Sequence, residues 1–189
     1  GKTSPAWPFV MLDSYFDGQR KSAIRTREAG LTIIRMTARN VPKVIEVDPS
    51  YYEKLFMEDC QFVNVSGSVI DFEDTNQASM QINLKNIACQ NAPVVINYAI
   101  SKSQLSAPGS IYNIKKYTYG LQMSDMDADP KNEITVDMEN LKKLAPTVLT
   151  DIPTLPAIDT WVNLSVLGAK GDGVTDDTKI IQEAIEKYT

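Results

Sequence analysis

The sequence contains no histidine, only two cysteines, and no apolar run long enough to cross a membrane. Without histidine the chain cannot form a Ser-His-Asp triad, a histidine metal site or the commonest general base. Its net charge of −5 and pI of about 4.8 argue against a surface that binds nucleic acid. We therefore expect no nucleic-acid partner and no transmembrane segment. Apolar residues make up 43% of the chain, which is enough for a buried core.

Four segments in the first half of the chain resemble one another. Each begins with an apolar–x–apolar triplet, passes through a turn rich in asparagine, glycine or proline, and ends with a short apolar strand. The segments are residues 9–26, 31–47, 55–72 and 82–98. Their spacing of about 21 to 27 residues is the length of one coil of a β-solenoid, in which each coil buries its apolar face against the next.

The second strand of every segment carries isoleucine at the same position. Successive side chains of a strand point to opposite faces, so this isoleucine column is predicted to face the core and its neighbouring column to face solvent. A β-sandwich would also give short strands, but it would not place one inward residue in four successive units. The inward column is Ile24, Ile45, Ile70 and Ile96, and the outward column is Arg25, Glu46, Asp71 and Asn97.

The repeat weakens after residue 98. Residues 99–110 are expected to form a polar loop, residues 111–114 to begin a fifth coil, and 117–123 to form a strand. A charged loop is predicted for residues 125–133, followed by a strand at 134–136 and a helical turn around 139–144. Prolines at positions 146, 153 and 156 favour an extended linker over residues 145–161.

Residues 162–188 carry the most specific motif of the chain. The pattern predicts a strand at 163–167, a tight turn at Gly171 and Gly173, and a helix capped by Thr175 or Asp176. The predicted helix has one apolar stripe, which comprises Ile180, Ile181, Ala184, Ile185 and Tyr188. This segment resembles the opening of a right-handed parallel β-helix in the pectate-lyase-like superfamily.

The fold predicted from the repeat and this resemblance is all-β, a right-handed parallel β-helix. We assign residues 1–144 to the C-terminal coils of a first helix, 145–161 to a proline-rich linker and 162–189 to the opener of a second helix. This order resembles tandem β-helix glycoside hydrolases, such as the family 55 exo-β-1,3-glucanases and family-28-related proteins. The resemblance implies a secreted or periplasmic protein that hydrolyses a polysaccharide. It also implies that the main groove lies in the second helix, so the remainder of its own chain is an expected partner.

Glu46 and Asp71 are the best candidates for catalytic carboxylates. Glycosidases need two carboxyl groups about 5–10 Å apart, and adjacent coils lie ~4.8 Å apart. Arg25 and Asn97 flank this pair and are predicted to bind substrate. The alternative is a solvated polar face in which Arg25 pairs with Glu46 and Asn97 donates a hydrogen bond to Asp71.

Aromatic residues offer a second route to sugar binding. Tyr51 and Tyr52 lie in the turn between the second and third coils, where exposed rings could stack on sugar rings. Tyr112, Tyr117 and Tyr119 are further candidates, and the alternative for all of them is cover for the solenoid.

Other polar groups and the cysteines are better explained by structure. The column Asp13, Arg35, Asp59 and Asn86 alternates in charge, which predicts mutual satisfaction. Asp125, Asp127 and Asp129 have the spacing of a calcium loop, but Pro130 replaces the glycine of an EF-hand and Val136 its bidentate glutamate, which favours a solvated loop. Asp172, Asp176 and Asp177 could bind a cation, but turn and capping roles explain them. We predict no metal and no cofactor. Cys60 and Cys89 are expected to be buried free thiols, and a disulfide is the alternative.

Two other functions remain open at this stage. One is a non-catalytic carbohydrate-binding protein of the tailspike or adhesin kind. The other is a polysaccharide lyase, which normally uses calcium and basic residues beside the acids.

Overall fold

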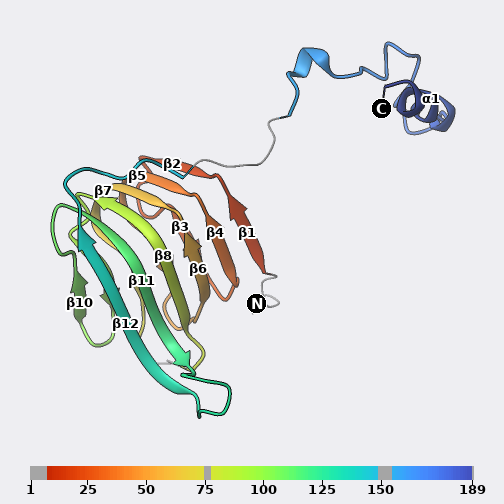
Figure 1. Ribbon diagram of the computed structural model, residues 1–189. Coiled ribbons are helices and arrows are strands. Elements are labelled where there is room, and N and C mark those ends of the chain that lie inside the picture. The colour runs from red at the N-terminus through yellow and green to blue at the C-terminus, as the bar shows by residue number, and fades with distance from the viewer. Residues whose placement is uncertain (1–7, 75–77, 149–154, 189) are drawn as a thin grey trace. The chain divides into compact units, whose positions relative to one another are not determined.

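The computed structural model describes residues 8–74, 78–148 and 155–188 (Figure 1). The chain divides into two compact units, Gly1–Thr150 and Asp151–Thr189. The first unit is a β-solenoid of about four coils, which confirms the predicted fold class of stacked parallel coils. The second unit contains the C-terminal helix.

The described residues of the first unit form twelve strands. They are β1 (Phe9–Leu12), β2 (Tyr15–Asp17), β3 (Ile24–Thr26), β4 (Leu31–Ile34), β5 (Thr37–Val47), β6 (Lys54–Glu58), β7 (Gln61–Phe72), β8 (Gln81–Gln90), β9 (Val94–Tyr98), β10 (Ser103–Ser106), β11 (Ile111–Gln122) and β12 (Lys131–Asn140).

Strands of successive coils pair in parallel on three faces. The first face contains β1, β4, β6 and the first half of β8. The second face contains β2 and the starts of β5 and β7, and β7 there pairs with the end of β8. The third face contains β3, the ends of β5 and β7, and β9. Long strands such as β5 and β7 therefore bend around a corner and serve two faces.

The predicted inward isoleucine column is confirmed on the third face. Ile24 pairs with Ile45, Ile45 with Ile70, and Ile70 with Ile96. Ile45, Ile70 and Ile96 are completely buried. On the first face the apolar triplets also stack in register, with Leu31 beside Leu55 and Leu55 beside Ile82. Each coil thus supplies one layer of the core and buries the layer of its neighbour.

Two corners of the solenoid are built from residues with positive φ. The first corner holds the column Asp13, Arg35, Asp59 and Asn86, at φ of 49° to 56°. Here Arg35 Nε donates to Asp13 Oδ1 at 2.7 Å, and Asn86 Nδ2 donates to Asp59 Oδ1 at 2.6 Å. The mutual satisfaction predicted for this column is present, and the Asp and Asn side chains of the column also tolerate the left-handed conformation.

The second corner carries a ladder of asparagines. Asn91 Nδ2 donates to Asn64 Oδ1, and Asn64 Nδ2 donates to Asn40 Oδ1, both at 3.0 Å. Asn40 in turn donates to Asp17 at 2.8 Å. Side-chain hydrogen bonds from coil to coil thus reinforce the backbone ladder where the chain turns between the second and third faces.

The coils end in antiparallel strands, contrary to part of the prediction. β10 pairs with β9 inside the segment predicted as a loop. β11 pairs with β8 in antiparallel orientation, so residues 111–114 do not begin a fifth coil. β12 completes a hairpin with β11, and Glu139 lies in this strand rather than in a helical turn. Pairing with β11 keeps the backbone of β12 extended up to Asn140. This pairing outweighs the weak helical pattern of residues 139–144.

The chain after β12 remains attached to the solenoid. Gln61 Nε2 donates to the carbonyl oxygen of Ala145 at 2.9 Å, and the Leu141 N–H donates to the Ile111 carbonyl oxygen at 2.9 Å. Residues 141–145 therefore lie against the first unit, at the start of the predicted linker.

Cys60 and Cys89 are buried free thiols, as predicted. Cys89 pairs with Phe62 in the neighbouring coil. Burial raises the pKa of Cys60 to about 11 and that of Cys89 to about 12. Both thiols are therefore inert at neutral pH.

The C-terminal unit contains a 3-10 turn (Ile158–Thr160) and the helix α1 (Thr178–Tyr188). The helix was predicted, and the Asp176 carboxylate caps it by accepting the Thr178 N–H at 3.0 Å. The strand predicted at 163–167 is wrong, because these residues form successive turns with N–H groups bonded to carbonyls three residues earlier. No helix among the described residues is long and apolar enough to cross a membrane.

Candidate functional site

The outward column, which holds the predicted catalytic and substrate-binding residues Arg25, Glu46, Asp71 and Asn97, lies on the outer side of the third face. Arg25 pairs with Glu46, Glu46 with Asp71, and Asp71 with Asn97 in the parallel ladder. The side chains retain part of their solvent exposure, from 16% for Asp71 to 53% for Arg25. The four backbone positions are thus neighbours as predicted, and the contacts of the side chains decide what chemistry they offer.

Lys43 connects the two candidate carboxylates. Its Nζ lies 3.0 Å from Glu46 Oε1 and 2.6 Å from Asp71 Oδ2. Burial opposes the charge of Lys43, but the hydrogen bonds to Asp71 and Glu46 outweigh it and raise the lysine pKa. The lysine therefore remains protonated beside both acids.

Asn97 completes the hydrogen bonding of Asp71. Asn97 Nδ2 donates to Asp71 Oδ1 at 3.2 Å, as the structural alternative predicted. Gln104 Nε2, from the antiparallel strand β10, donates to Asn97 Oδ1 at 3.2 Å. Asp71 is therefore held by an ammonium group and an amide at once.

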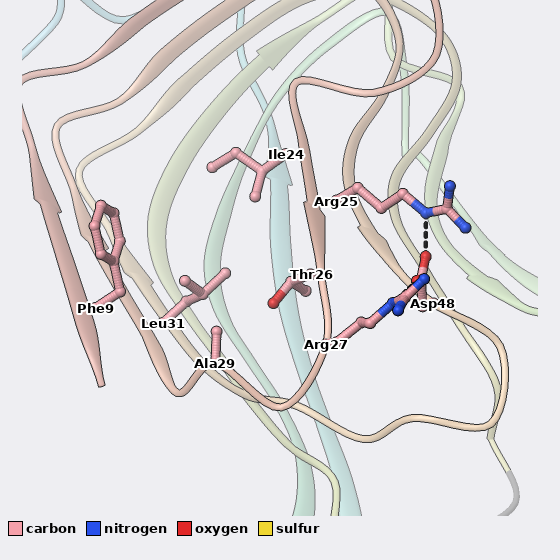
Figure 2. Close-up of a pocket in the computed structure, with 8 residues that line it drawn as sticks. All are labelled: Phe9, Ile24, Arg25, Thr26, Arg27, Ala29, Leu31 and Asp48. Atoms are coloured by element: carbon pink, nitrogen blue, oxygen red, sulfur yellow. Dashed lines mark hydrogen bonds and ion pairs between the residues drawn. The ribbon is translucent and has the colours of Figure 1, made fainter. Parts of the chain in front are cut away.

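Arg25 does not pair with Glu46. Its Nε instead forms an ion pair with Asp48, and Arg27 Nε pairs with the other oxygen of the same carboxylate. The prediction of an Arg25–Glu46 pair is wrong because Asp48, just beyond the end of β5, offers a carboxylate that is 97% buried. Figure 2 shows both arginines pointing to Asp48 from one side of the strand, with Phe9, Ile24 and Leu31 on the other side.

The electrostatics of Asp48 follow from this double ion pair. Burial disfavours the charged carboxylate, but hydrogen bonds from Arg27 and Arg25 outweigh it and lower the pKa of Asp48. The same contact raises the pKa of Arg27. Asp48 therefore stays ionised over the whole physiological pH range.

Tyr51 belongs to this cluster. The Arg27 guanidinium carbon lies 5.3 Å from the centre of the Tyr51 ring, in a cation–π arrangement. The Tyr51 N–H donates to the Asp48 carbonyl oxygen at 3.1 Å. Tyr51 and Tyr52 are 36% and 39% exposed, so both rings reach solvent as predicted.

A cavity of about 510 Å³ lies beside the arginine pair. Its lining combines polar and apolar side chains: Phe9, Ile24, Arg25, Thr26, Arg27, Ala29, Leu31 and Asp48 (Figure 2). Beneath it the fully buried Glu53 accepts hydrogen bonds from the Thr26 hydroxyl and from the backbone N–H groups of Ala29, Gly30 and Lys54. These donors account for both oxygens of Glu53, whose role is to hold the corner between β3 and β4.

Sequence reasoning missed Arg27, Asp48 and Glu53. Arg27 follows Arg25 by two positions, so both side chains lie on the same outward face. Thr26 pairs with Val47, which places Asp48 opposite Arg27 in the next coil. The repeat alignment alone could therefore have found the Arg27–Asp48 pair, whereas nothing local marks the corner role of Glu53.

The tyrosines of β11 are core residues. Tyr112 and Tyr117 are completely buried and Tyr119 is 2% exposed, so none of them can stack on a sugar ring. The Tyr112 hydroxyl donates to the Ala92 carbonyl oxygen at 2.8 Å. Burial raises the pKa values of Tyr112 and Tyr117. The alternative prediction, cover for the solenoid, is confirmed for these three residues.

The acidic loops have structural partners. Asp172 accepts the Thr175 and Val174 N–H groups at 2.7 and 2.9 Å, and these bonds lower its pKa to about 2. Asp177 accepts the N–H groups of Lys170 and Gly171. In the part of the chain that the structure describes, no group of three or more Cys, Asp or Glu side chains is arranged to hold a metal ion.

In comparison with known proteins, the sequence matches no family model and no curated protein.

Proposed function

We propose that this chain belongs to a carbohydrate-active protein, a glycoside hydrolase of polysaccharides, in which the solenoid unit binds the polymer and does not cleave it. The observation that carries the non-catalytic part is the position of Lys43 between Glu46 and Asp71, at 3.0 and 2.6 Å. The carbohydrate part rests on the resemblance to tandem β-helix glycoside hydrolases and on the surface beside the column. A secreted or periplasmic location belongs to the same proposal.

The chemistry of glycosidases explains why Lys43 is decisive. One carboxyl group must donate a proton to the leaving oxygen, and the other must attack the sugar or activate water between them. An ammonium group in ion pairs with both acids occupies that space and contacts the oxygens that would have to act on the sugar. Glu46 and Asp71 are thus better suited to holding adjacent coils together than to acid–base catalysis.

The surface beside the column suits binding. Arg25, Asn97, Tyr51 and Tyr52 present partly exposed polar and aromatic groups of the kinds that contact sugar hydroxyls and ring faces. Arg25 lies in the first coil, the two tyrosines follow the second and Asn97 lies in the fourth, so they are spread over several ~4.8 Å steps of the solenoid. A polymer laid across the coils would meet several of these groups at once, which increases affinity through multiple weak contacts.

One observation favours a second candidate, hydrolysis by Glu46 and Asp71 themselves. The two residues pair in register on adjacent coils, and that spacing is compatible with a retaining mechanism. A lyase is less well supported, because the raised pKa of Lys43 makes it a poor base for proton abstraction.

Two assays on the same preparation test the proposal. A glycan array measures binding, and a reducing-end assay with an ultraviolet measurement of unsaturated products detects hydrolysis or elimination. We expect binding to at least one polysaccharide without new reducing ends from the chain alone. Absence of binding to every glycan would refute the proposal, and new reducing ends or unsaturated products would favour the hydrolase or the lyase candidate.

A further inference from the structure

Strand β12 has an unpaired edge. It pairs with β11 along one side, and in the part of the chain that the structure describes no strand pairs with its other side (Figure 1). In an antiparallel pair, alternate residues direct their N–H and C=O groups away from the partner strand. β12 therefore offers a row of backbone donors and acceptors to which a further strand can bond.

The neighbouring antiparallel strand β10 is protected from such pairing, and β12 is not. β10 has four residues, and a register shift between Leu105 and Ser106 disturbs its ladder with β9. Short length and bulges are devices by which proteins stop an edge from pairing further. β12 has ten residues and no proline, and the extra residue in its pairing with β11, Lys115, belongs to β11.

The inner face of β12 extends the apolar surface of the core. Ile134 pairs with Tyr119 and Val136 with Tyr117, so both lie on the face of the sheet that carries these buried tyrosines. Ile134 and Val136 are nevertheless 50% and 41% exposed. No charged side chain of β12 lies on this face, so nothing there opposes an added strand whose apolar side chains cover the two residues.

The outer face of the same strand is acidic. Glu139 pairs with Lys115 at 2.9 Å. Asp137 lies opposite Lys116 in the ladder, but among the described residues neither Asp137 nor Glu133 forms an ion pair. Two carboxylates four residues apart on one face are therefore left for cations from outside the unit.

We propose that β12 is a docking edge for an extended segment of another protein, with apolar side chains opposite Ile134 and Val136 and basic side chains opposite Glu133 and Asp137. The segment has the pattern basic–apolar–x–apolar–basic. Main-chain hydrogen bonds supply affinity, and the alternate side chains supply specificity. This partner is independent of the proposed glycan binding.

The charge of β12 favours such a segment over a second copy of this chain. The outer row of β12 contains three acids and one lysine, Lys131. Pairing two such rows would place an excess of like charge across the joint, which destabilises a sheet. A basic segment neutralises the same row.

The test uses the full chain and three fluorescein-labelled peptides, measured by fluorescence anisotropy at low ionic strength. TKVTVKT carries the pattern and reads the same in both directions, so it fits parallel or antiparallel addition. TEVTVET replaces its lysines by glutamates, and TKKTVVT keeps its composition without the alternation. We expect TKVTVKT to bind at least about tenfold more tightly than either control peptide, and less tightly as salt is added.

A matched pair of variants locates the binding. Ile134→Lys places a charge on the inner face of the edge and should weaken TKVTVKT binding at least about tenfold. Ile100→Lys changes an isoleucine of nearly the same exposure, 51%, that follows β9, and should bind as the wild type does. Thermal unfolding establishes that both variants fold, and the comparison of peptides on the wild type decides the question if they do not.

Four results would overturn the proposal. They are no binding of TKVTVKT, equal binding of either control peptide, equal losses in the two variants, and a dimer in sedimentation that Ile134→Lys abolishes and that excludes TKVTVKT. The last result would make a second copy the occupant of the edge.

Discussion

Two columns run side by side along the third face, one directed to the core and one to solvent. Ile45 and Glu46 are neighbours on one strand, and so are Ile70 and Asp71. The isoleucines contact their own equivalents in the next coil. Among the outward residues, Asn97 also contacts its equivalent Asp71, but the other contacts described are to groups from other positions: Lys43, Asp48 and Gln104. An inward column is therefore built by the repeat itself, whereas an outward column depends on residues that the repeat does not specify.

The largest expected effect lies in the inward column. Ile70→Ala removes a fully buried side chain between two coils and should lower the free energy of unfolding by about 3 to 4 kcal/mol, through lost burial and a residual cavity. Urea unfolding followed by circular dichroism measures this. The matched change one position away, Asp71→Asn, should cost less than about 1 kcal/mol. Equal losses in the two variants would remove the distinction between the columns.

The two ion pairs of the buried Asp48 carboxylate are expected to come next. Asp48→Asn leaves Arg25 and Arg27 without their shared carboxylate and should destabilise the fold by about 2 kcal/mol at neutral pH. The folded-state pKa of Asp48 is lowered, so its stabilisation is complete above the unfolded pKa of ~3.9. It is lost as the pH falls through the folded value.

Unfolding of wild type and Asp48→Asn from pH 7 down to pH 2 checks this dependence. The difference between the two proteins should be constant at neutral pH and should shrink in acid. A difference that grows as the pH falls would show that the two arginines do not stabilise the ionised carboxylate.

The bridge at Lys43 should have a smaller effect. Lys43→Gln removes both ion pairs and leaves Glu46 and Asp71 adjacent with like charges, which we expect to cost no more than about 1 kcal/mol at this partly exposed site. Adding Glu46→Gln to that variant should recover part of the lost free energy of unfolding. A double-mutant cycle of Lys43→Gln with Asp71→Asn, measured by urea unfolding, gives the coupling between the two coils, and zero coupling would mean that the lysine does not connect them.

The smallest effect is local and concerns Asp172. Its partners are N–H groups of residues 174 and 175, and its pKa of about 2 should be visible as a titration midpoint by NMR. Thr175→Ala removes only the hydroxyl donor and should raise that midpoint slightly, because the two backbone bonds remain. A midpoint near 4 in the wild type would mean that the loop does not form.

Much of the solenoid could be predicted because stacking is a property of the repeat. The register of Ile24, Ile45, Ile70 and Ile96 follows from aligning the segments, and so does the polar corner at Asp13 and Arg35. The strands predicted at 117–123 and 134–136 lie within or largely within β11 and β12, but β10 and the antiparallel pairing could not be predicted, since pairing with β8 and β9 has no counterpart in the repeat.

The candidate site was only partly predictable for the same reason. The alignment placed Arg25, Glu46, Asp71 and Asn97 side by side, which is correct for the backbone. It could not show that a long lysine side chain on the same strand reaches both acids. It also did not weigh Asp48 against Glu46 as a partner for Arg25, because that choice depends on burial just beyond the end of the strand.

The most direct test of the proposed function is the rate of reducing-end release from the polysaccharide that the chain binds best. It should be measured for the wild type and for the double variant Glu46→Gln/Asp71→Asn, with binding affinity measured on the same samples. We predict that the double variant binds the polysaccharide as tightly as the wild type and that neither protein releases reducing ends above background. Release by the wild type that falls at least about a hundredfold in the double variant, at unchanged affinity, would contradict this and would make Glu46 and Asp71 catalytic.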